Sequence, residues 1–282
     1  MTTICSLVIL WIVNMFNKLN KGGFSTIRIC TEEDGASILE YLEQSSYFNV
    51  FLLSDISLYG FDKSFQTVYA NFENERINGV YLQFHNNLIV TGSTPEIDFL
   101  MQMIRSGINT CMGPYENISE IQKLTDPAGT VSKKELLMLN SDQMLLENDP
   151  EIQVAAEEDI KDILKLLHTE PEYRIMYASE SMIHNRIRSG EGTHLILKRD
   201  GKIIAHINSA ARTSRACMIG GILVRDHCRD MEIAEKMISS LCRLELSQGR
   251  NPEIFNGFHC ISNIFPRLGF NTIGDWGVIS FS

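Results

Sequence analysis

One pattern of residues occurs in both halves of the chain, and it constrains the fold more than any other feature. Residues 27–44, IRICTEEDGASILEYLEQ, alternate as a strand and continue through acidic residues into an amphipathic helix. Residues 152–170, IQVAAEEDIKDILKLLHTE, repeat this order after a polar connector at 140–150. The repeat predicts two related domains. We place the boundary near residue 145, between a domain at 24–145 and a second at 146–282.

The remaining pattern predicts further strands and helices. In the first half we expect a helix at 46–61 and then three strands within 67–92, separated by polar turns at 73–76 (ENER) and 85–87 (HNN), with Asn78–Gly79 marking a tight bend. Helices at 94–107 and near 119–124 and a strand at 135–140 follow. In the second half we expect a helix at 179–189, strands at 193–198, 202–212 and 215–224, a long helix at 230–247, and then a strand, a short helix ending at Leu268 and a terminal strand. This order predicts the mixed α/β class, an α+β layer of sheet and helices.

An apolar run at 4–16, ICSLVILWIVNMF, precedes the first predicted strand. It is shorter than the ~20 residues of a spanning helix, and neither Lys nor Arg precedes it, as a signal peptide would require. We interpret residues 1–23 as an extension outside the fold, with Met15 as an alternative start. A weak membrane anchor is the other interpretation, but no stable membrane association is expected.

The formal net charge of −10 argues against binding to nucleic acid, which needs a basic surface. An apolar fraction of 44% and a charged fraction of 21% are those of an ordinary globular protein. The seven cysteines are odd in number and form no CxxC pair. This pattern indicates reduced thiols, no metal site and a cytoplasmic protein.

The stretch GGILVRDHCRDMEIAEKMISSLCRL, residues 220–244, reads as a strand that enters a helix through a short polar turn. The free N–H groups and the dipole of a helix N-terminus favour an anion such as a phosphate. Glycines usually line such a site, because a side chain would occupy the place of the phosphate oxygens. Here the turn carries Asp230 and Glu232 instead.

This stretch and the residues after it resemble the GNAT superfamily of acyl-CoA-dependent N-acyltransferases. The resemblance is carried by Gly220–Gly221, the helix AEKMISSLCRLELSQGRNP and the ending RLGFNTIGDW, in this order and spacing. It covers residues 215–276 well and 25–282 loosely. The nearest pattern is that of bacterial two-domain members, in which a degenerate GNAT-like N-terminal domain precedes a GNAT C-terminal domain. Each domain is then expected to be a mostly antiparallel twisted sheet flanked by helices.

The resemblance implies that acetyl-CoA is a co-substrate, with its pantetheine arm along the strand and its pyrophosphate at the turn. The residues at those positions are Ile222, Leu223, Val224, Arg229, Asp230, Met231, Glu232, Ile233 and Ala234. Arg229 and Ala234 match the pattern, whereas Asp230 and Glu232 stand where glycines are usual. A carboxylate about 5 Å from a phosphate costs about 3 kcal/mol at an effective dielectric of about 20. Either both carboxylates replace the pyrophosphate, or they form an ordinary acidic helix start, which the dipole favours.

A second departure concerns proton transfer. Phe265 stands where many members carry a tyrosine that gives a proton to the departing thiolate, and phenylalanine has no proton to give. The general base is also open. His206, within the strand at 202–212, is the best candidate, although a single histidine in a strand is more often structural.

The sequence therefore leads to one functional expectation and one alternative. The expectation is an N-acetyltransferase that moves an acetyl group from acetyl-CoA to an amine of a small molecule or peptide. The alternative is a non-catalytic module of the same fold that binds a ligand or protein and has lost the use of CoA. Asp230, Glu232 and Phe265 favour the alternative, whereas Arg229 and Ala234 favour the enzyme.

Overall fold

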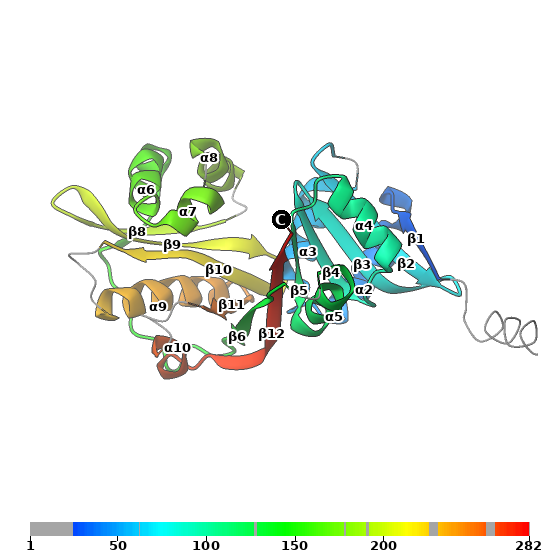
Figure 1. Cartoon of the computed structure of the whole chain (residues 1–282). Coiled ribbons are helices and arrows are strands. Elements are labelled where there is room, and N and C mark those ends of the chain that lie inside the picture. Colours follow the sequence, from blue (N-terminus) through cyan, green and yellow to red (C-terminus); the bar gives the residue numbers. More distant parts are fainter. Residues whose placement is uncertain are drawn as a thin grey trace, which may run out of the picture. The chain divides into compact units, whose positions relative to one another are not determined.

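Two compact units make up the protein, and they are shown in Figure 1. The computed structural model describes residues 25–61, 63–126, 129–177, 179–189, 192–225, 231–257 and 263–281. The extension expected at 1–23 lies outside these residues. Within the described part of the chain, no helix has the length and apolar character that a membrane span requires.

Unit 1 comprises residues 1–41, 61–131 and 279–282. Its strands form a sheet in the order β1-β2-β3-β4-β5, antiparallel except for the parallel pair β4–β5. The elements are β1 (Ser25–Ile29), the 3-10 turn η1 (Glu32–Asp34), α2 (Gly35–Glu43), β2 (Gln66–Glu73), β3 (Arg76–Phe84), β4 (Asn87–Gly92), α4 (Ile97–Arg105), β5 (Thr110–Pro114) and α5 (Tyr115–Thr125).

Unit 2 comprises residues 42–60 and 132–278, and its strands lie in the order β12-β6-β11-β10-β9-β8-β7. All neighbours are antiparallel except β10 and β11. The elements are α3 (Val50–Tyr59), β6 (Ser132–Met138), β7 (Ile152–Val154), η2 (Glu157–Asp159), α6 (Ile160–Leu167), α7 (Pro171–Met176), α8 (Glu180–Ser189), β8 (His194–Arg199), β9 (Lys202–Arg212), β10 (Ala216–Val224), α9 (Met231–Ser247), β11 (Asn251–Asn256), α10 (Ile264–Arg267) and β12 (Asn271–Ser280).

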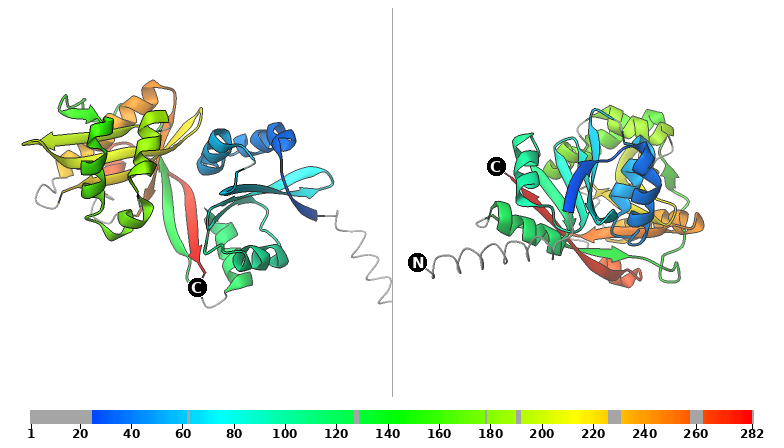
Figure 2. Two further views of the ribbon diagram at one scale, coloured as in Figure 1. Left: turned by 90° about the horizontal axis from the view of Figure 1, so that it is seen from above. Right: turned by 90° about the vertical axis from the view of Figure 1, so that its right-hand side faces the viewer.

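Helices cover both faces of the unit 2 sheet, with α9 on one side and α6, α7 and α8 on the other (Figure 1; Figure 2, left). Side chains of a strand alternate between the two faces. Accordingly, Leu195 of β8 packs with Met237 of α9, whereas the next residue, Ile196, packs with Ile163 of α6. Helix α3 contributes Val50 to a third buried cluster, which includes residues of β6, β9 and β10.

The repeated sequence pattern forms the same local structure in each unit. The Asp34 carboxylate accepts a hydrogen bond from the Thr31 backbone N–H at 2.9 Å, and the Asp159 carboxylate accepts one from the Ala156 N–H at 3.0 Å. Each aspartate thereby satisfies a donor that the start of the helix leaves free. The mixed class and the mostly antiparallel sheets flanked by helices are confirmed.

The two units divide the chain differently from the ranges expected from the sequence. Residues 132–145 belong to unit 2 rather than to the first domain, and so do residues 42–60, which contain α3. Strand β6 explains the first difference, because it lies between β11 and β12 and pairs with both. A sequence boundary placed at a polar connector cannot detect a strand that pairs with partners far ahead in the chain.

Three local features also differ from expectation. Asn78–Gly79 lies inside β3, where the register with β2 shifts, and not at a tight bend. The chain turns at Asn74–Glu75, within the polar stretch expected to separate the two strands. Strand β5 and helix α7 were not predicted. Both are short, and β5 contains a glycine and ends at a proline, which depress the strand signal.

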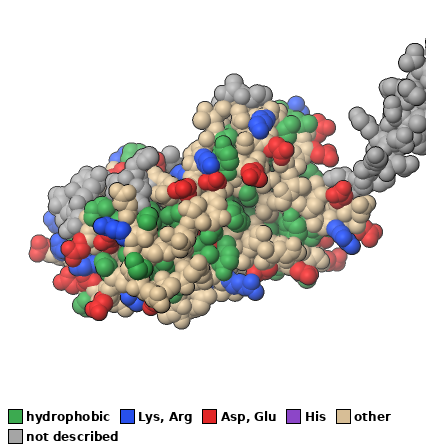
Figure 3. Space-filling view, turned by 90° about the horizontal axis from the view of Figure 1, so that it is seen from below, with side chains coloured by type: hydrophobic (Ala, Val, Ile, Leu, Met, Phe, Trp, Pro, Cys, Tyr) green, Lys and Arg blue, Asp and Glu red, His purple; other side chains and the backbone are tan. Residues whose placement is uncertain are grey.

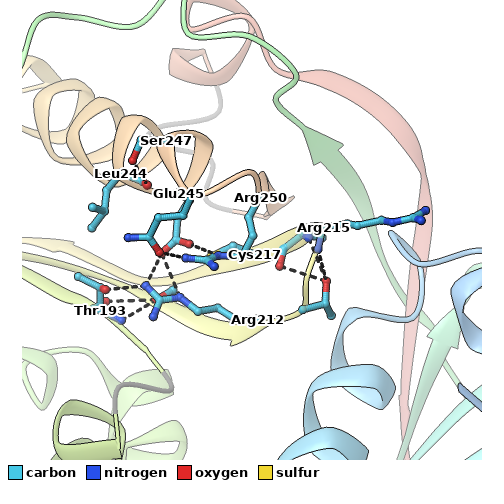
Figure 4. A network of polar contacts seen from close by, with 12 residues as sticks. Thr193, Arg212, Arg215, Cys217, Leu244, Glu245, Ser247 and Arg250 are labelled. Carbon is cyan, nitrogen blue, oxygen red and sulfur yellow. Dashed lines mark hydrogen bonds and ion pairs between the residues drawn. The ribbon is translucent and has the colours of Figure 1, made fainter.

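A buried ion network joins the end of α9 to the sheet of unit 2 (Figure 4). Glu245 is fully buried, and its carboxylate accepts hydrogen bonds from Arg212 of β9 and, at 2.7 Å, from Nε of Arg250. Arg212 also donates to the Thr193 hydroxyl at 2.5 Å. Both carboxylate oxygens are paired, so the network links the end of α9 to β9.

Candidate functional site

Strands β10 and β11 of unit 2 pair along a short parallel stretch and then separate. Only three residue pairs join them, from Ala216–Asn251 to Met218–Glu253. Beyond Met218, β10 continues to Val224 with β9 as its partner. Within the described residues, the edge of β10 that faces β11 is therefore left with unpaired backbone groups, which an extended ligand can bind.

A bulge in β10 lies at the start of this unpaired edge. The register with β9 runs from Gly220–Asn208 to Leu223–His206, so β10 carries one extra residue. Gly221 adopts a φ of 57°, and a Cβ atom there would lie 2.3 Å from Oδ1 of Asn208 and 2.9 Å from the Tyr177 hydroxyl. Only glycine fits this position without displacing its neighbours.

Two buried histidines hold the bulge through a chain of hydrogen bonds. Nδ1 of His206 lies 2.7 Å from the carbonyl oxygen of Gly221, and Nε2 of His206 lies 2.9 Å from Nδ1 of His194. A carbonyl only accepts, so Nδ1 of His206 carries the proton and, in the neutral ring, its Nε2 accepts. Nδ1 of His194 must then be the donor, which leaves Nε2 of His194 as an unprotonated acceptor.

Burial keeps both rings neutral. It lowers the pKa of His206 to about 4, partly offset by the hydrogen bond to Gly221. It lowers the pKa of His194 to about 2, helped by the positive charges near it. His206 is fully buried and both of its nitrogens are engaged. It is therefore not placed to accept a proton from a substrate, and the catalytic interpretation of His206 is replaced by a positioning role.

Tyr173 of α7 and Tyr177, the residue that follows α7, hold the same region. The Tyr173 hydroxyl donates to the carbonyl oxygen of Ile222 at 3.1 Å, and the Tyr177 hydroxyl donates to Oδ1 of Asn208 at 2.8 Å. Their rings pack edge to face, with centroids 5.8 Å apart. The short helix that sequence reasoning missed thus holds β10 in its bulged form.

The start of α9 is described from Met231 onward, so Arg229 and Asp230 lie outside the described residues. Ile233 and Ala234 are buried in the core beneath the helix. The Glu232 carboxylate is 64% exposed and forms an ion pair with Lys236 at 2.9 Å, and Lys236 also lies 3.4 Å from Asp149. This geometry favours an ordinary acidic helix start for Glu232, with its charge compensated by a lysine.

The remaining predicted residues occupy the strand and the core. Ile222 packs on the α9 side, Leu223 packs with the tyrosines of α7, and Val224 is partly buried. Phe265 is fully buried and packs edge to face with Phe270 at a centroid distance of 5.7 Å. Its position is one of core packing.

Glu253 is a candidate that sequence reasoning missed. It is fully buried in β11, at the last position that pairs with β10, and neither carboxylate oxygen has a hydrogen-bond partner among the described residues. Its register partners Met138 and Met218 are apolar. Burial therefore raises the pKa of Glu253 to about 9. The available signal was an acidic residue within the apolar strand PEIF, which is unusual without a function.

A second carboxyl with a raised pKa belongs to α3. Burial raises the pKa of Asp55 to about 7, and the positive charge of Arg186 in α8 opposes part of that shift. The neighbouring Ser54 hydroxyl accepts a hydrogen bond from the Arg212 backbone N–H at 3.3 Å. Acids with raised pKa values are common at catalytic sites. Sequence reasoning placed α3 in the other domain and did not consider it.

Comparisons with solved structures agree with this geometry. A tandem GNAT protein from the clavulanic acid biosynthesis pathway matches with a TM-score of 0.60 and 10% identity, over 92% of this chain and 98% of that chain. A GCN5-related N-acetyltransferase from Sphaerobacter thermophilus matches with a TM-score of 0.60 and 13% identity, over 90% and 94%. A GNAT-family acetyltransferase from Colwellia psychrerythraea matches with a TM-score of 0.54 and 15% identity, over 91% and 100%.

The chain therefore has the fold of the GNAT acetyltransferases, and it shares that fold with a tandem member along most of its length. The recognition made from the sequence is confirmed at the level of the fold. The sequence matches no protein-family model and no curated protein.

Proposed function

We propose that the protein is an acyl-CoA-dependent N-acyltransferase that transfers an acetyl group from acetyl-CoA to an amine of a small molecule or peptide. The observation that carries the proposal is the separation of β10 from β11 beside the glycine bulge, in the strand that precedes α9 in the chain. The resemblance places the pantetheine arm along this strand and the pyrophosphate at the turn after it, and the shared fold supports the proposal.

The residues fit such a co-substrate. The unpaired edge of β10 offers backbone groups to an extended amide-containing arm, and the free N–H groups of α9 favour a phosphate. We propose that Ile222, Leu223 and Val224 bind the arm and that residues 229–234 bind the pyrophosphate. The ion pair between Lys236 and Glu232 reduces the repulsion that Glu232 would otherwise exert on a phosphate.

The reaction forms a C–N bond at the thioester carbonyl carbon and breaks the C–S bond, and the amine must lose a proton. A backbone N–H of the β10 edge polarises the thioester carbonyl. A thiol with a pKa of about 8.5 leaves tolerably as a thiolate, so the buried Phe265 does not prevent transfer. Phe265 and Glu232 therefore weigh less against the enzyme, and we do not favour the non-catalytic alternative.

We propose Glu253 as the group that takes the proton of the amine. It stands where β10 and β11 separate, and neither of its oxygens has a hydrogen-bond partner within the described residues. The ionised form of Glu253 has no cationic partner among the described residues, and the ammonium group of the amine substrate would supply one. His206 instead holds the carbonyl of Gly221 and keeps the bulge in place.

We also propose, as from the sequence, that the protein is cytoplasmic, with reduced thiols, and that it does not bind nucleic acid. One further feature supports each of these proposals. Four described cysteines are buried free thiols: Cys30, Cys111, Cys217 and Cys242. On the face shown in Figure 3, basic side chains are interspersed with acidic ones and do not gather into a basic area.

Calorimetry of the full chain with acetyl-CoA tests the proposal. We expect saturable heat and a rise in melting temperature by mass action, with ATP as the control for phosphate binding alone. Release of free CoA thiol in the presence of an amine panel measures transfer. The absence of both heat and a thermal shift at millimolar acetyl-CoA would contradict the proposal. Binding without transfer to any amine would support the non-catalytic alternative.

A further inference from the structure

Among the buried polar atoms of unit 2 that lack a partner within the described residues, two belong to residues that lie directly opposite each other. They are Nε2 of His194 in β8 and Nδ2 of Asn208 in β9. His194 is 1% exposed and Asn208 is 0% exposed. Opposed residues of antiparallel strands have Cβ atoms about 5 Å apart on the same face, so both atoms lie in one small region.

The hydrogen bonds around these atoms fix their roles. The chain from Gly221 through His206 leaves Nε2 of His194 as a lone-pair acceptor. Oδ1 of Asn208 accepts from Tyr177, which leaves the Nδ2 amide as a donor. One acceptor and one donor are therefore both buried, and leaving either without a partner costs free energy.

We propose that the acceptor substrate carries an uncharged group with both a donor and an acceptor, such as a carboxamide, and that His194 and Asn208 bind it. The N–H of the carboxamide donates to Nε2 of His194, and its carbonyl accepts from Nδ2 of Asn208. This inference rests on the proposed function, because it identifies the substrate class of that site.

Charged groups fit less well. A carboxylate has no proton for the lone pair of His194 and would face it with a negative charge. An ammonium group has no lone pair for the Asn208 donor. Asn208 is also the residue that Gly221 approaches at the bulge, so a group held here lies beside the bulge of β10, on its β9 side.

Matched amines test the proposal on the full chain. Three series of increasing length are used: glycinamide, β-alaninamide and 4-aminobutanamide; the carboxylates glycine, β-alanine and 4-aminobutanoate; and the apolar isosteres isobutylamine, 3-methylbutylamine and 4-methylpentylamine. We expect the best carboxamide to exceed its carboxylate and its isostere by about 100-fold in kcat/KM, because a site built for hydrogen bonds rejects analogues that lack them. Thermal shifts with the same amines measure binding without acetyl-CoA.

The variant His194→Asn gives a second, independent readout. Asparagine keeps an amide near the position of Nδ1, which can still donate to His206, but it lacks an atom at the position of Nε2. We expect the variant to fold and its preference for carboxamides to fall at least tenfold. The control is His184→Asn, which changes a partly exposed histidine on α8 and should keep the full preference.

The outcomes separate this inference from the proposed function. Transfer to amines without a preference for carboxamides at any length overturns the inference and leaves the acyltransferase intact. A thermal shift by carboxamides alone, without acetyl-CoA binding by calorimetry, supports the subsite and contradicts the acyltransferase. Absence of both transfer and thermal shift with every carboxamide overturns the inference, as does an unchanged preference in His194→Asn.

Discussion

Glu253 and His206 are both fully buried on strands of unit 2, yet their surroundings give them different chemistry. The His206 ring has hydrogen-bond partners at both nitrogens. The Glu253 carboxylate has none within the described residues, and its neighbours Met138 and Met218 offer no charge. A carboxyl in this setting stays protonated at neutral pH and becomes a base when a cation enters or the pH rises.

The raised pKa of Glu253 predicts a pH dependence of both activity and stability. Folded Glu253 retains its proton up to a pKa of about 9, against 4.5 for an ordinary glutamate, so its contribution to stability is fully present below 4.5 and is lost as pH rises toward 9. Transfer should show the opposite trend, with kcat/KM increasing up to about pH 9 as the base form appears.

Glu253→Gln checks both trends. The variant should lose about 10²-fold or more in kcat/KM and should no longer lose stability between pH 5 and 9 relative to the wild type in urea unfolding. Glu151→Gln, at an exposed position, is the control and should follow the wild type. A wild-type rate that is independent of pH, or full activity in Glu253→Gln, would rule out this residue as the base.

At the scale of secondary structure, the bulge of β10 organises the candidate site. It lies just beyond the last residue of β10 that pairs with β11, and it brings Gly221 against Asn208. The hydrogen bonds from His206 and Tyr173 hold its carbonyls. The bulge therefore depends on contacts from β9 and α7 as much as on its own glycines. Such bulges re-aim backbone groups beside active sites.

Gly221→Ala tests the need for this bulge. A left-handed backbone costs a non-glycine residue about 1–2 kcal/mol, and the contact of the new Cβ with Asn208 adds an overpacking cost of about 1–3 kcal/mol. Gly201→Ala has a φ of 71° with nothing within 4 Å of the new Cβ, so it isolates the backbone cost. Urea unfolding should show a larger loss for Gly221→Ala, together with weaker acetyl-CoA binding. Equal losses in the two variants would show that the close approach to Asn208 is not important.

At the scale of the whole chain, unit 2 is assembled from two separate segments, 42–60 and 132–278. The first supplies α3 with Val50 and Asp55, and the second begins with β6 between β11 and β12. A fragment of residues 146–282 therefore lacks a central strand as well as a covering helix. Removal of a central strand leaves two unpaired edges and an exposed apolar face.

We predict that the 146–282 fragment does not fold as a monomer. A longer fragment, 130–282, regains β6 and should recover part of the soluble yield, and co-expression of 24–145 with 146–282 should recover more because it supplies α3 as well. Circular dichroism melting and size-exclusion chromatography measure the result. A cooperative melt of the monomeric 146–282 fragment would contradict the division of the chain into these units.

The sequence by itself determined the features that depend on neighbouring residues. The strand alternation, the acidic helix starts with Asp34 and Asp159, and the long helix after Gly220–Gly221 are local patterns, and the resemblance to GNAT proteins followed from their order. The structure confirmed these elements and the fold.

Only the tertiary structure decided which residues form the site. His194, Asn208 and Glu253 come from three strands, and their roles follow from which of their atoms have partners, which no local pattern records. The assignment of α3 and β6 to unit 2 likewise depends on pairing between residues far apart in the chain. Local propensity acts over a few residues, whereas burial and strand pairing depend on the whole chain, and so the chemistry of these side chains was not readable before folding.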